Sequence, residues 1–389
     1  MKKVLRIIFS LTLIILGCFL LYIQKDNFFK SNNKPKKENN TVLIEDKDVE
    51  KSLFKKYYKK ARKIVSEMTL EEKVGQLFLV RYEKNDIEYL SNFNPGGYIL
   101  FAKDFDNHTK DSMKEELSND QKLSKYPLIL GVDEEGGYVT RISRFKEFRD
   151  EKFKSPRDYY NEGGFQLVEQ TENEKAELLK ELGLNLNLAP VADVSTNPDD
   201  FINIRTFGSD ATTTADYISK MVDYANNNKI NSCLKHFPGY GNNVDTHTGV
   251  AIDNRSYEEI STNDYLPFKS GIEHNVPCVL VSHNVVNSID SSLPSSLSKK
   301  VIDELRQKLE FSGIIITDDL DMEAVKAYAE NNEAATLAIN AGNDMIITSD
   351  FINMRSEVLE SIKNNKIEED TINKAVLRVI AWKYYSNLF

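Results

Sequence analysis

Several side chains that can transfer protons or bind charged and polar groups stand directly after short apolar runs in this chain. In chain order they are Asp133, Glu134, Glu135, Arg141, Asp193, Arg205, Lys235, His236, His283, Asp318 and Asp319. Loops that follow buried strands are commonly polar, and this rule accounts for one or two such positions. It accounts poorly for a Lys-His pair, a His and an Asp pair that each follow an apolar strand. We therefore expect these side chains to share one site.

The sharpest motif reads Lys-His-Phe-Pro-Gly-Tyr-Gly over residues 235–241 and is followed by Asp-Thr-His over residues 245–247. The two glycines permit backbone conformations that suit a loop above a strand end. An Asp two residues before a His can accept from one ring nitrogen and leave the other available for proton transfer near neutral pH. Taken alone, this spacing more often marks an ordinary surface histidine. We give this motif more importance because polar residues also follow the neighbouring predicted strands.

Short apolar runs alternate with amphipathic stretches over most of the chain. The predicted strands are Gln76–Val80, Gly97–Phe101, Leu128–Asp133, Leu186–Pro190, Ser232–His236, Cys278–His283, Gly313–Asp318 and Asp344–Thr348. The predicted helices include Glu172–Leu182, Ala211–Lys229, Lys299–Leu309, Glu323–Ala341 and Thr371–Tyr384. Continuous apolar strands that alternate with helices indicate parallel strands covered on both faces. Eight of them predict an α/β fold, a single (β/α)8 barrel of the TIM type, rather than an open doubly wound sheet.

A barrel of this kind carries its active site at the carboxyl ends of its strands. The polar residues named above follow those ends, so the predicted fold and the predicted site agree. No GxGxxG or GxxxxGK[ST] motif follows a predicted strand, which argues against a nucleotide-binding domain.

The first 23 residues are typical of a membrane segment. Lys2, Lys3 and Arg6 precede an uncharged, mostly apolar run from Ile7 to Ile23. We favour an uncleaved membrane anchor over a cleaved signal, because no small residues end the run. A lipoprotein signal with Cys18 as the modified residue is the alternative. Each of these places the catalytic domain outside the cytoplasm, because basic residues flanking such segments stay cytoplasmic.

Residues 24–48 are rich in Lys, Asn and Asp and predict a flexible polar tether. The catalytic domain is expected over residues 49–389. It begins with apolar residues at helical spacing from Val49 to Met68. Thr69 and Glu72 then stand at the spacing of a capping box, which predicts the start of the next helix.

The composition limits the possible partners. The 389 residues are 41% hydrophobic and 28% charged, so most of the chain can bury a core. Fifty Lys and Arg against sixty Asp and Glu give a net charge of −10, so we expect no nucleic-acid partner. Three cysteines cannot form a disulfide framework, and no CxxC spacing suggests zinc. Cys233 and Cys278 lie on neighbouring predicted strands, where we expect both to be buried small apolar residues.

Taken together, the motifs resemble the family 3 glycoside hydrolases, specifically their bacterial β-N-acetylglucosaminidase branch. Besides KHFPGYG and DTH, the chain contains DEEGGYVTR, NLNLAPVADV, RTFG, PSSLS and TDDLDM in the family's order. The likeness runs from about Leu53 to the C-terminus. It implies a (β/α)8 barrel that acts as a retaining exo-glycosidase and requires neither a metal nor a cofactor.

The resemblance also implies the role of each site residue. It makes Asp318 the nucleophile, His247 the general acid/base and Asp245 the partner of that histidine. Strand periodicity cannot choose Asp318 over Asp319, so this choice depends on the family alone. The residues expected to bind the terminal sugar are Asp133, Arg141, Arg205, Lys235 and His236.

Two departures from the family pattern lie beside the predicted acid/base. Tyr240 stands where the motif usually has a second His, and Thr248-Gly249-Val250 replaces the usual residues after the catalytic His. We expect these two departures to affect the preference for a leaving group more than the chemistry of the reaction. Outside the cell, the expected substrate is a GlcNAc-containing glycan or muropeptide from peptidoglycan. We expect a monomer.

Other functions stay open at this point. The chain could have the sugar specificity of β-glucosidase-like family members. A metal-dependent barrel hydrolase could use His236, His247, His283 and Asp318 as zinc ligands, although no His-x-His pair lies near the first strand. A non-catalytic protein that binds wall sugars is the third alternative, and the intact Asp318, His247 and Asp245 argue against it.

Overall fold

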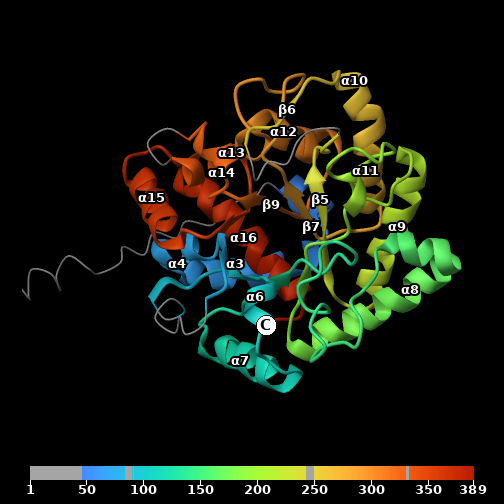
Figure 1. Ribbon diagram of the computed structural model, residues 1–389. Coiled ribbons are helices and arrows are strands. Elements are labelled where there is room, and N and C mark those ends of the chain that lie inside the picture. The colour runs from blue at the N-terminus through green and yellow to red at the C-terminus, as the bar shows by residue number, and fades with distance from the viewer. Residues whose placement is uncertain (1–45, 84–89, 91, 242–248, 330–332) are drawn as a thin grey trace, which may run out of the picture. The chain divides into compact units, whose positions relative to one another are not determined.

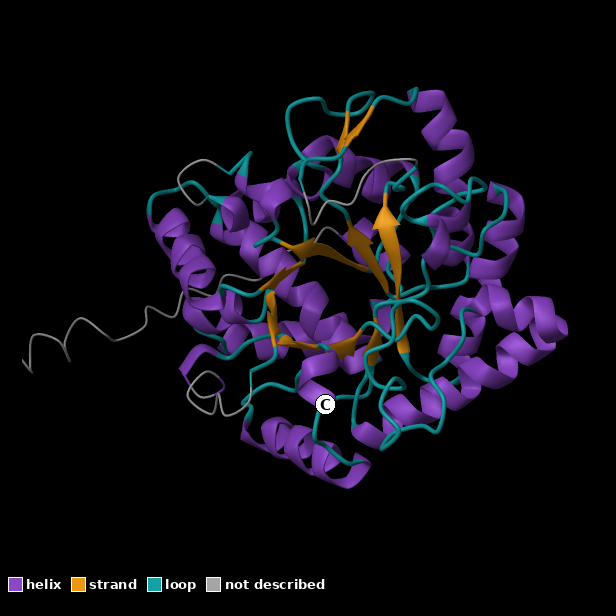
Figure 2. Cartoon of the chain, in the orientation of Figure 1, coloured by secondary structure: helices purple, strands orange, loops and turns teal. Residues whose placement is uncertain are grey.

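The computed structural model describes residues 46–83, 90, 92–241, 249–329 and 333–389. Within them, eight parallel strands close into a barrel in the order β1-β10-β9-β7-β5-β4-β3-β2 (Figure 2). The strands are β1 (Phe78–Arg81), β2 (Gly97–Leu100), β3 (Ile129–Val132), β4 (Leu186–Asn187), β5 (Asn231–Phe237), β7 (Cys278–Val281), β9 (Ile314–Asp319) and β10 (Met345–Thr348). Each predicted strand is present, and the predicted (β/α)8 barrel is confirmed.

Helices surround this barrel (Figure 1). The α-helices are α2 (Asp46–Lys51), α3 (Tyr58–Glu67), α4 (Leu70–Gly75), α6 (Ala102–Phe105), α7 (Lys110–Leu123), α8 (Pro156–Leu182), α9 (Ala211–Asn227), α10 (Tyr257–Glu259), α11 (Tyr265–Glu273), α12 (Lys299–Asp303), α13 (Glu323–Lys326), α14 (Ala334–Ala341), α15 (Phe351–Lys363) and α16 (Glu369–Tyr385). Short 3-10 or π segments are η1 (Lys55–Tyr57), η2 (Asn203–Arg205), η3 (Ile260–Asp264), η4 (Ser295–Leu297) and η5 (Glu304–Lys308).

Local sequence signals set several helix ends. The Thr69 side chain accepts from the Glu72 amide, and the Glu72 carboxylate accepts from the Thr69 amide, so the predicted capping box of α4 is confirmed. Gly183 ends α8 with a φ of 86°, and Gly342 ends α14 with a φ of 109°. This left-handed conformation costs glycine little and turns the chain back toward the next strand.

One helix prediction is wrong. The stretch Glu323–Ala341 forms the separate helices α13 and α14, and Asn331 and Asn332 lie between them in the sequence. Asparagine side chains compete for backbone hydrogen bonds and favour a break. The helical spacing from Val49 to Met68 is likewise divided among α2, η1 and α3.

Helix α16 closes the amino-terminal end of the barrel. Its Trp382 Nε1 donates to Asn231 Oδ1 at the start of β5, at 2.9 Å. Its Lys383 Nζ donates to Gln76 Oε1 just before β1, at 2.6 Å. Strands β1 and β5 lie on opposite sides of the ring, so α16 crosses beneath it. Burial lowers the pKa of Lys383 to about 7.

A second, two-stranded sheet pairs β6 (Ile252–Asp253) with β8 (Val285–Val286) outside the barrel. It was not expected from the sequence, because two residues are too few to form a recognisable apolar run. The sheet connects the chain after β5 to the loop after β7.

The expectation for the barrel cysteines is wrong in one respect. Cys233 on β5 and Cys278 on β7 are fully buried, but they form a disulfide. The two residues are directly paired in the register of the two parallel strands, with their Cα atoms 4.4 Å apart. This separation lies within the range that a disulfide can bridge. The sequence predicted the neighbouring strands but not their register.

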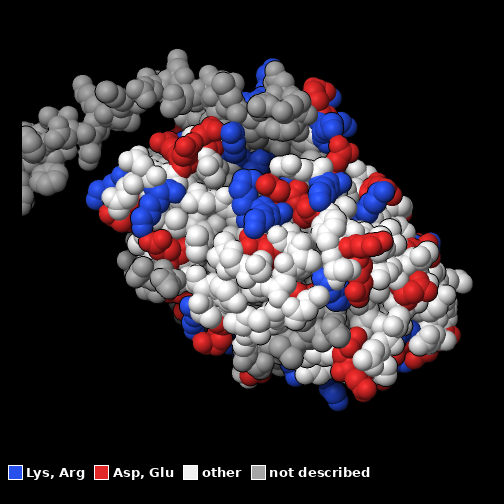
Figure 3. Space-filling view, turned by 90° about the horizontal axis from the view of Figure 1, so that it is seen from above, with Lys and Arg blue, Asp and Glu red and all other residues white. Residues whose placement is uncertain are grey.

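The predicted membrane segment, residues 1–23, lies outside the described residues, as does most of the predicted tether. No helix in the described part of the chain has the length and apolarity needed to cross a bilayer. On the face of the molecule seen in Figure 3, acidic and basic side chains are interspersed around an uncharged area.

Candidate active site

A pocket of about 440 Å³ opens at the carboxyl ends of the barrel strands. Eight of the eleven polar residues expected from the sequence to share a site line it: Asp133, Glu135, Arg141, Arg205, Lys235, His236, Asp318 and Asp319. They follow or end β3, β4, β5 and β9, so the barrel gathers side chains that are far apart in the chain.

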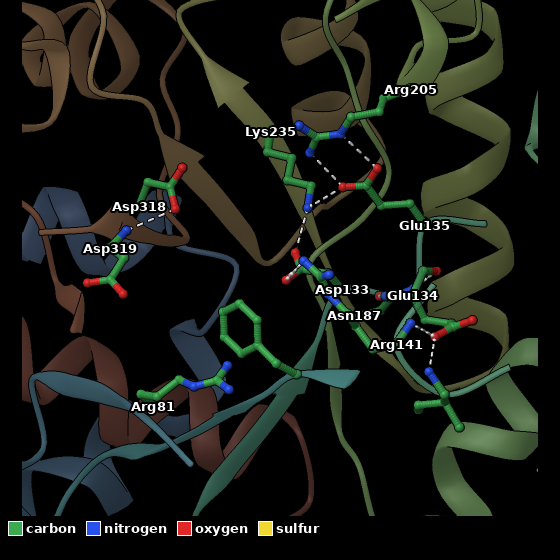
Figure 4. Close-up of polar contacts among 12 residues, drawn as sticks. Arg81, Asp133, Glu134, Glu135, Arg141, Asn187, Arg205, Lys235, Asp318 and Asp319 are labelled. Atoms are coloured by element: carbon green, nitrogen blue, oxygen red, sulfur yellow. Dashed lines mark hydrogen bonds and ion pairs between the residues drawn. The ribbon is translucent and has the colours of Figure 1, made fainter. Parts of the chain in front are cut away.

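Four charged side chains form what we call the pocket cluster: Asp133, Glu135, Arg205 and Lys235. Lys235 Nζ donates to Asp133 Oδ1 at 2.7 Å and lies 2.6 Å from Glu135 Oε1. The Arg205 guanidinium binds both oxygens of the Glu135 carboxylate, at 2.7 and 3.1 Å. Figure 4 shows this cluster on one side of the pocket, with the carboxylate of Asp318 on the other side.

Glu135 remains ionised because of its two cationic partners. Burial by itself would raise the pKa of this carboxyl, but the charges of Arg205 and Lys235 and their hydrogen bonds outweigh that effect. They hold the pKa of Glu135 well below its ordinary value. Glu135 therefore stays ionised at neutral pH, and its ion pairs hold the Arg205 and Lys235 donors in place.

His236 is held between a carboxylate and a guanidinium. Its Nδ1 lies 2.8 Å from Asp193 Oδ2, and its Nε2 lies 3.2 Å from Arg205 Nη2. A guanidinium can only donate, so Nε2 accepts and the ring proton is on Nδ1, which donates to Asp193. Asp193 also accepts from the backbone amides of His236 and Tyr240, at 3.1 and 2.7 Å. One carboxylate thus orients both the ring and the following loop.

The two aspartates that end β9 have different surroundings. Asp319 accepts from Ser349 Oγ at 2.7 Å, from the Ser349 amide at 3.3 Å and from the Asp321 amide at 3.0 Å. These donors tie its carboxylate to the loop after β10. Asp318 accepts from the Asp319 amide at 2.9 Å and faces the pocket cluster (Figure 4). This arrangement separates the two carboxylates, which strand periodicity could not do.

Glu134 supports the loop that carries Arg141. Its buried carboxylate accepts from the backbone amides of Arg141 and Ile142, both at 2.8 Å, and from the Ser143 hydroxyl. The loop brings Arg141 Nη2 to 3.8 Å from Asp133 Oδ2. The guanidinium also lies 5.1 Å from the centre of the Phe101 ring. Glu134 is therefore a structural carboxylate, although it stands beside the binding residues in the sequence.

His283 has partners at both ring nitrogens. Nδ1 lies 2.7 Å from Ser296 Oγ, and Nε2 lies 2.9 Å from the Asp319 carbonyl oxygen. The carbonyl only accepts, so Nε2 donates to it. Like His236, this histidine has both nitrogens engaged and offers neither to zinc. Among the described residues, no three or more His, Cys, Asp or Glu side chains are grouped so that they could hold a metal ion.

A second charged group, which we call the support cluster, consists of Asp253, Arg255 and Asp264. Arg255 binds both oxygens of Asp253 and donates to Asp264 Oδ2 at 2.8 Å. The group packs under the loop after β5. A Cβ atom at Gly239 would lie 2.2 Å from Asp264 Oδ1, and one at Gly241 would lie 2.5 Å from the Arg255 guanidinium carbon. Both glycines have positive φ, and a Cβ atom would clash at each position, so both positions require glycine.

The pKa of Asp264 is shifted in the opposite direction from that of Glu135. Burial raises its pKa, Arg255 lowers it in part, and the carboxylates of Asp193 and Asp253 raise it further, to about 7. Its Oδ1 has no hydrogen-bond partner among the described residues.

Two predicted catalytic residues, Asp245 and His247, lie outside the described residues, and their roles stay predictions. Two other residues received no role from the sequence although they contact the predicted set. Glu135 binds Arg205 and Lys235, and Asp193 holds His236. The sequence signal that could have indicated Glu135 and Asp193 is their position after predicted apolar strands. Nothing in the sequence distinguished Glu135 from Glu134.

The family is shown by comparison with known proteins. Residues 69–382 match the N-terminal domain of glycosyl hydrolase family 3. The chain belongs to this family of glycoside hydrolases, and the resemblance drawn from its motifs is confirmed.

Three relatives illustrate the likeness. A beta-hexosaminidase from Haemophilus influenzae is 31% identical over 298 residues, which cover 74% of this chain and 81% of that enzyme. Beta-hexosaminidase A from Pseudoalteromonas piscicida is 28% identical over 324 residues, which cover 76% of this chain and 54% of that enzyme. A solved family 3 beta-N-acetylglucosaminidase from a Paenibacillus species has a TM-score of 0.76 at 25% identity, covering 82% of this chain and 63% of that one. The match thus spans little more than half of the Pseudoalteromonas enzyme.

Proposed function

We propose that this protein is a retaining exo-β-N-acetylglucosaminidase that removes terminal β-linked GlcNAc from a glycan. The observation that carries the proposal is the pocket itself, in which Asp318 faces the pocket cluster across a space lined below by the buried barrel residues Ile99, Leu280 and Ile347 (Figure 4). A pocket with a closed floor suits the end of a glycan rather than its interior. Relatives named beta-hexosaminidase and beta-N-acetylglucosaminidase support the choice of sugar.

In the first step, an Asp318 oxygen attacks the anomeric carbon and the bond to the leaving oxygen breaks. His247 gives its proton to that oxygen, and Asp245 stabilises the histidine. The product is a covalent glycosyl-enzyme and a free leaving-group alcohol. The positive charge that develops on the sugar ring favours a site with a carboxylate at this position.

In the second step, a water molecule attacks the anomeric carbon and His247 takes its proton. The bond from the carbon to Asp318 breaks, and the carboxylate is restored. Two inversions give net retention of the anomeric configuration. Both steps balance with water as the only co-reactant.

The pocket cluster suits the hydroxyls of the terminal sugar. Each hydroxyl both donates and accepts, and the charged side chains supply strong partners of both kinds. The ion pairs among these side chains hold them in place before the sugar binds, which reduces the entropy lost on binding.

We further propose that the substrate is peptidoglycan or its muropeptide fragments, and that the catalytic domain lies outside the cytoplasm on a membrane anchor at residues 1–23. The buried disulfide between Cys233 and Cys278 supports this location, because disulfides persist in oxidising compartments.

The function is tested with nitrophenyl β-glycosides of GlcNAc, GalNAc, glucose and xylose on the domain from residue 46 onward. We expect a clear preference for GlcNAc. Faster turnover of the glucoside would mean that the protein has the sugar specificity of another branch of the family.

The location is tested with the full chain expressed in a bacterial cell. It should sediment with membranes, and deletion of residues 1–23 should release a soluble, active domain. A secreted form that begins near Lys25 would contradict the uncleaved anchor, and lipid on Cys18 would favour the lipoprotein alternative.

A further inference from the structure

The wall of the pocket changes character from its interior to its opening. The polar side chains of Glu135, Lys235 and His236 are all less than 7% exposed. Tyr138 and Phe201 line the same pocket, but their exposed fractions are 70% and 37%. The interior is therefore polar and buried, whereas the opening carries aromatic rings that reach solvent.

Tyr138 is presented by a tight turn. Gly136 and Gly137 have positive φ, and the amides of Glu135 and Gly136 both donate to the Val139 carbonyl at 3.1 Å. The Gly137 amide donates to the Phe153 carbonyl at 2.8 Å, which anchors the turn to the body of the domain. The ring thus stands on a fixed backbone while most of its surface faces solvent.

Phe201 lies on the neighbouring loop after β4 and contacts a deeper aromatic ring. Its ring centre is 6.0 Å from that of Tyr240, at an interplanar angle of 50°. Tyr240 is buried and lies edge-on to His236, with the ring centres 5.2 Å apart. A series of aromatic rings therefore runs from His236 at the interior to Phe201 at the opening.

Ligand pockets are lined mainly by hydrophobic and aromatic side chains with a few polar groups, and Tyr138 and Phe201 are exposed aromatic side chains of this lining. Below this rim, the pocket cluster already provides partners for a terminal sugar. Whatever is attached to that sugar must leave through the opening.

We infer that Tyr138 and Phe201 form a binding site for the leaving group, and that its occupant is the second sugar ring of a β-linked glycan. The inference rests on the proposed function. A pyranose ring has a flat face of C–H groups that packs on an aromatic ring, and its hydroxyls remain in water at the edge. The two aromatic side chains then select a saccharide leaving group over a small one.

The test uses the disaccharide GlcNAc-β-1,4-GlcNAc as substrate and free GlcNAc as a competitive inhibitor, on the domain from residue 46 onward. The inhibitor occupies the interior alone, whereas the disaccharide extends over the rim. Tyr138→Ala and Phe201→Ala should each lower kcat/KM for the disaccharide about tenfold. The inhibition constant of GlcNAc should not change.

Matched variants separate the ring from the fold. Tyr138→Phe and Phe201→Tyr keep the aromatic ring and should keep at least half of the wild-type kcat/KM. Unchanged kcat/KM in both alanine variants, with an active wild type, would overturn the rim inference alone. A wild type that cleaves no GlcNAc β-glycoside would overturn the proposed function, and the inference with it.

A third substrate distinguishes the two possible leaving groups. The same disaccharide with a peptide attached to its reducing sugar should show the same loss in the alanine variants. A loss confined to the peptide-bearing substrate would mean that the rim binds peptide, which contradicts a sugar occupant.

Discussion

The pocket cluster and the support cluster are both built from buried charges beside the same strand, β5, yet their central carboxyls differ in ionisation. Glu135 is 6% exposed, and the side chain of Asp264 is 1% exposed. The pKa of Glu135 is held well below its usual value, whereas that of Asp264 rises to about 7. Burial is nearly the same in the two places, so burial does not decide the outcome.

The balance of partners decides it. Glu135 has two cations within hydrogen-bonding distance, Arg205 and Lys235. Asp264 shares one cation, Arg255, with a second carboxylate, Asp253. Lys235 is shared with Asp133, but the pocket cluster still has two cations for two carboxylates, whereas the support cluster has one cation for two. One cluster is thus a fixed charged surface for a ligand, and the other is close to titration beneath the loop that leads to the predicted acid/base.

The largest expected loss of activity follows substitution of Asp318, the carboxylate that faces the pocket cluster (Figure 4). Asp318→Ala removes the group that forms the covalent intermediate, so activity on every substrate should fall about 10⁴-fold or more. Asp319→Ala is the matched control, because that carboxylate is held by Ser349 and Asp321. Mass spectrometry of the trapped glycosyl-enzyme checks the assignment. Loss of the intermediate in Asp319→Ala rather than Asp318→Ala would reverse the two roles.

The next largest loss of activity is expected for His247, which follows in the sequence the loop that the support cluster contacts. His247→Ala removes the proton donor and base, and should cost about 10²–10⁴-fold on a disaccharide. A nitrophenol leaving group hardly needs a proton, so the first step should suffer less with that substrate, and intermediate should accumulate as a burst. Azide needs no base, so it should restore turnover and yield a β-glycosyl azide.

For Asp318→Ala, the most that azide can yield is the inverted product. Full activity of His247→Ala on disaccharides would exclude the proposed role of this histidine.

A matched pair of substitutions tests the comparison directly. Glu135→Gln leaves the buried Arg205 guanidinium without its carboxylate, while Lys235 keeps Asp133, and should lower the free energy of unfolding by about 3–5 kcal/mol. Asp264→Asn makes the same chemical change in the support cluster, where Arg255 keeps Asp253. It should not lower the unfolding free energy at pH 7.5 and should raise it, because a carboxyl whose folded pKa is raised destabilises the folded state at that pH. Urea denaturation measures both, and equal losses would show that burial rather than partner balance is decisive.

The smallest effect is a difference in pH dependence. The folded pKa of Asp264 is about 7, above the unfolded value of about 3.9, so the unfolded state releases this proton first as the pH rises. Wild type should therefore lose unfolding free energy relative to Asp264→Asn between about pH 4 and 7, by at most about 1.4 kcal/mol per pH unit.

The contribution of Glu135 to the pH dependence of the unfolding free energy has the opposite sign. Its folded pKa is lowered, so its stabilisation is complete above the unfolded pKa of about 4.3 and is lost as the pH falls below it. Urea titrations from pH 3 to 8 should show the two variants diverging from wild type in these separate intervals. A flat difference for Asp264→Asn would contradict its raised pKa.

Much of the architecture was predictable because its causes are local. Apolar runs of five or six residues indicated the barrel strands, and Thr69 with Glu72 indicated the start of α4. The order of polar residues after the strands also indicated which side chains would meet. Parallel strands end on one face of a barrel, so position along each strand is enough to group Asp133, Lys235 and Asp318.

Pairings between distant segments were not predictable. The disulfide of Cys233 and Cys278 depends on the register between β5 and β7, and a shift of one residue would turn the two side chains to opposite faces. The attachment of Asp319 to Ser349 likewise depends on how β9 lies against β10.

The sequence by itself determined the barrel, the face on which its polar residues gather and the family to which it belongs, because each depends on residue types at short spacing. The tertiary structure alone decided that Glu135 is a charged member of the pocket while Glu134 holds a loop. It also decided that the pKa of Asp264 is raised to about 7 and that the exposed rings of Tyr138 and Phe201 line the pocket. These outcomes depend on the distance and sign of charges brought together from far along the chain, as in the contact between Lys235 and Asp133, 102 residues apart.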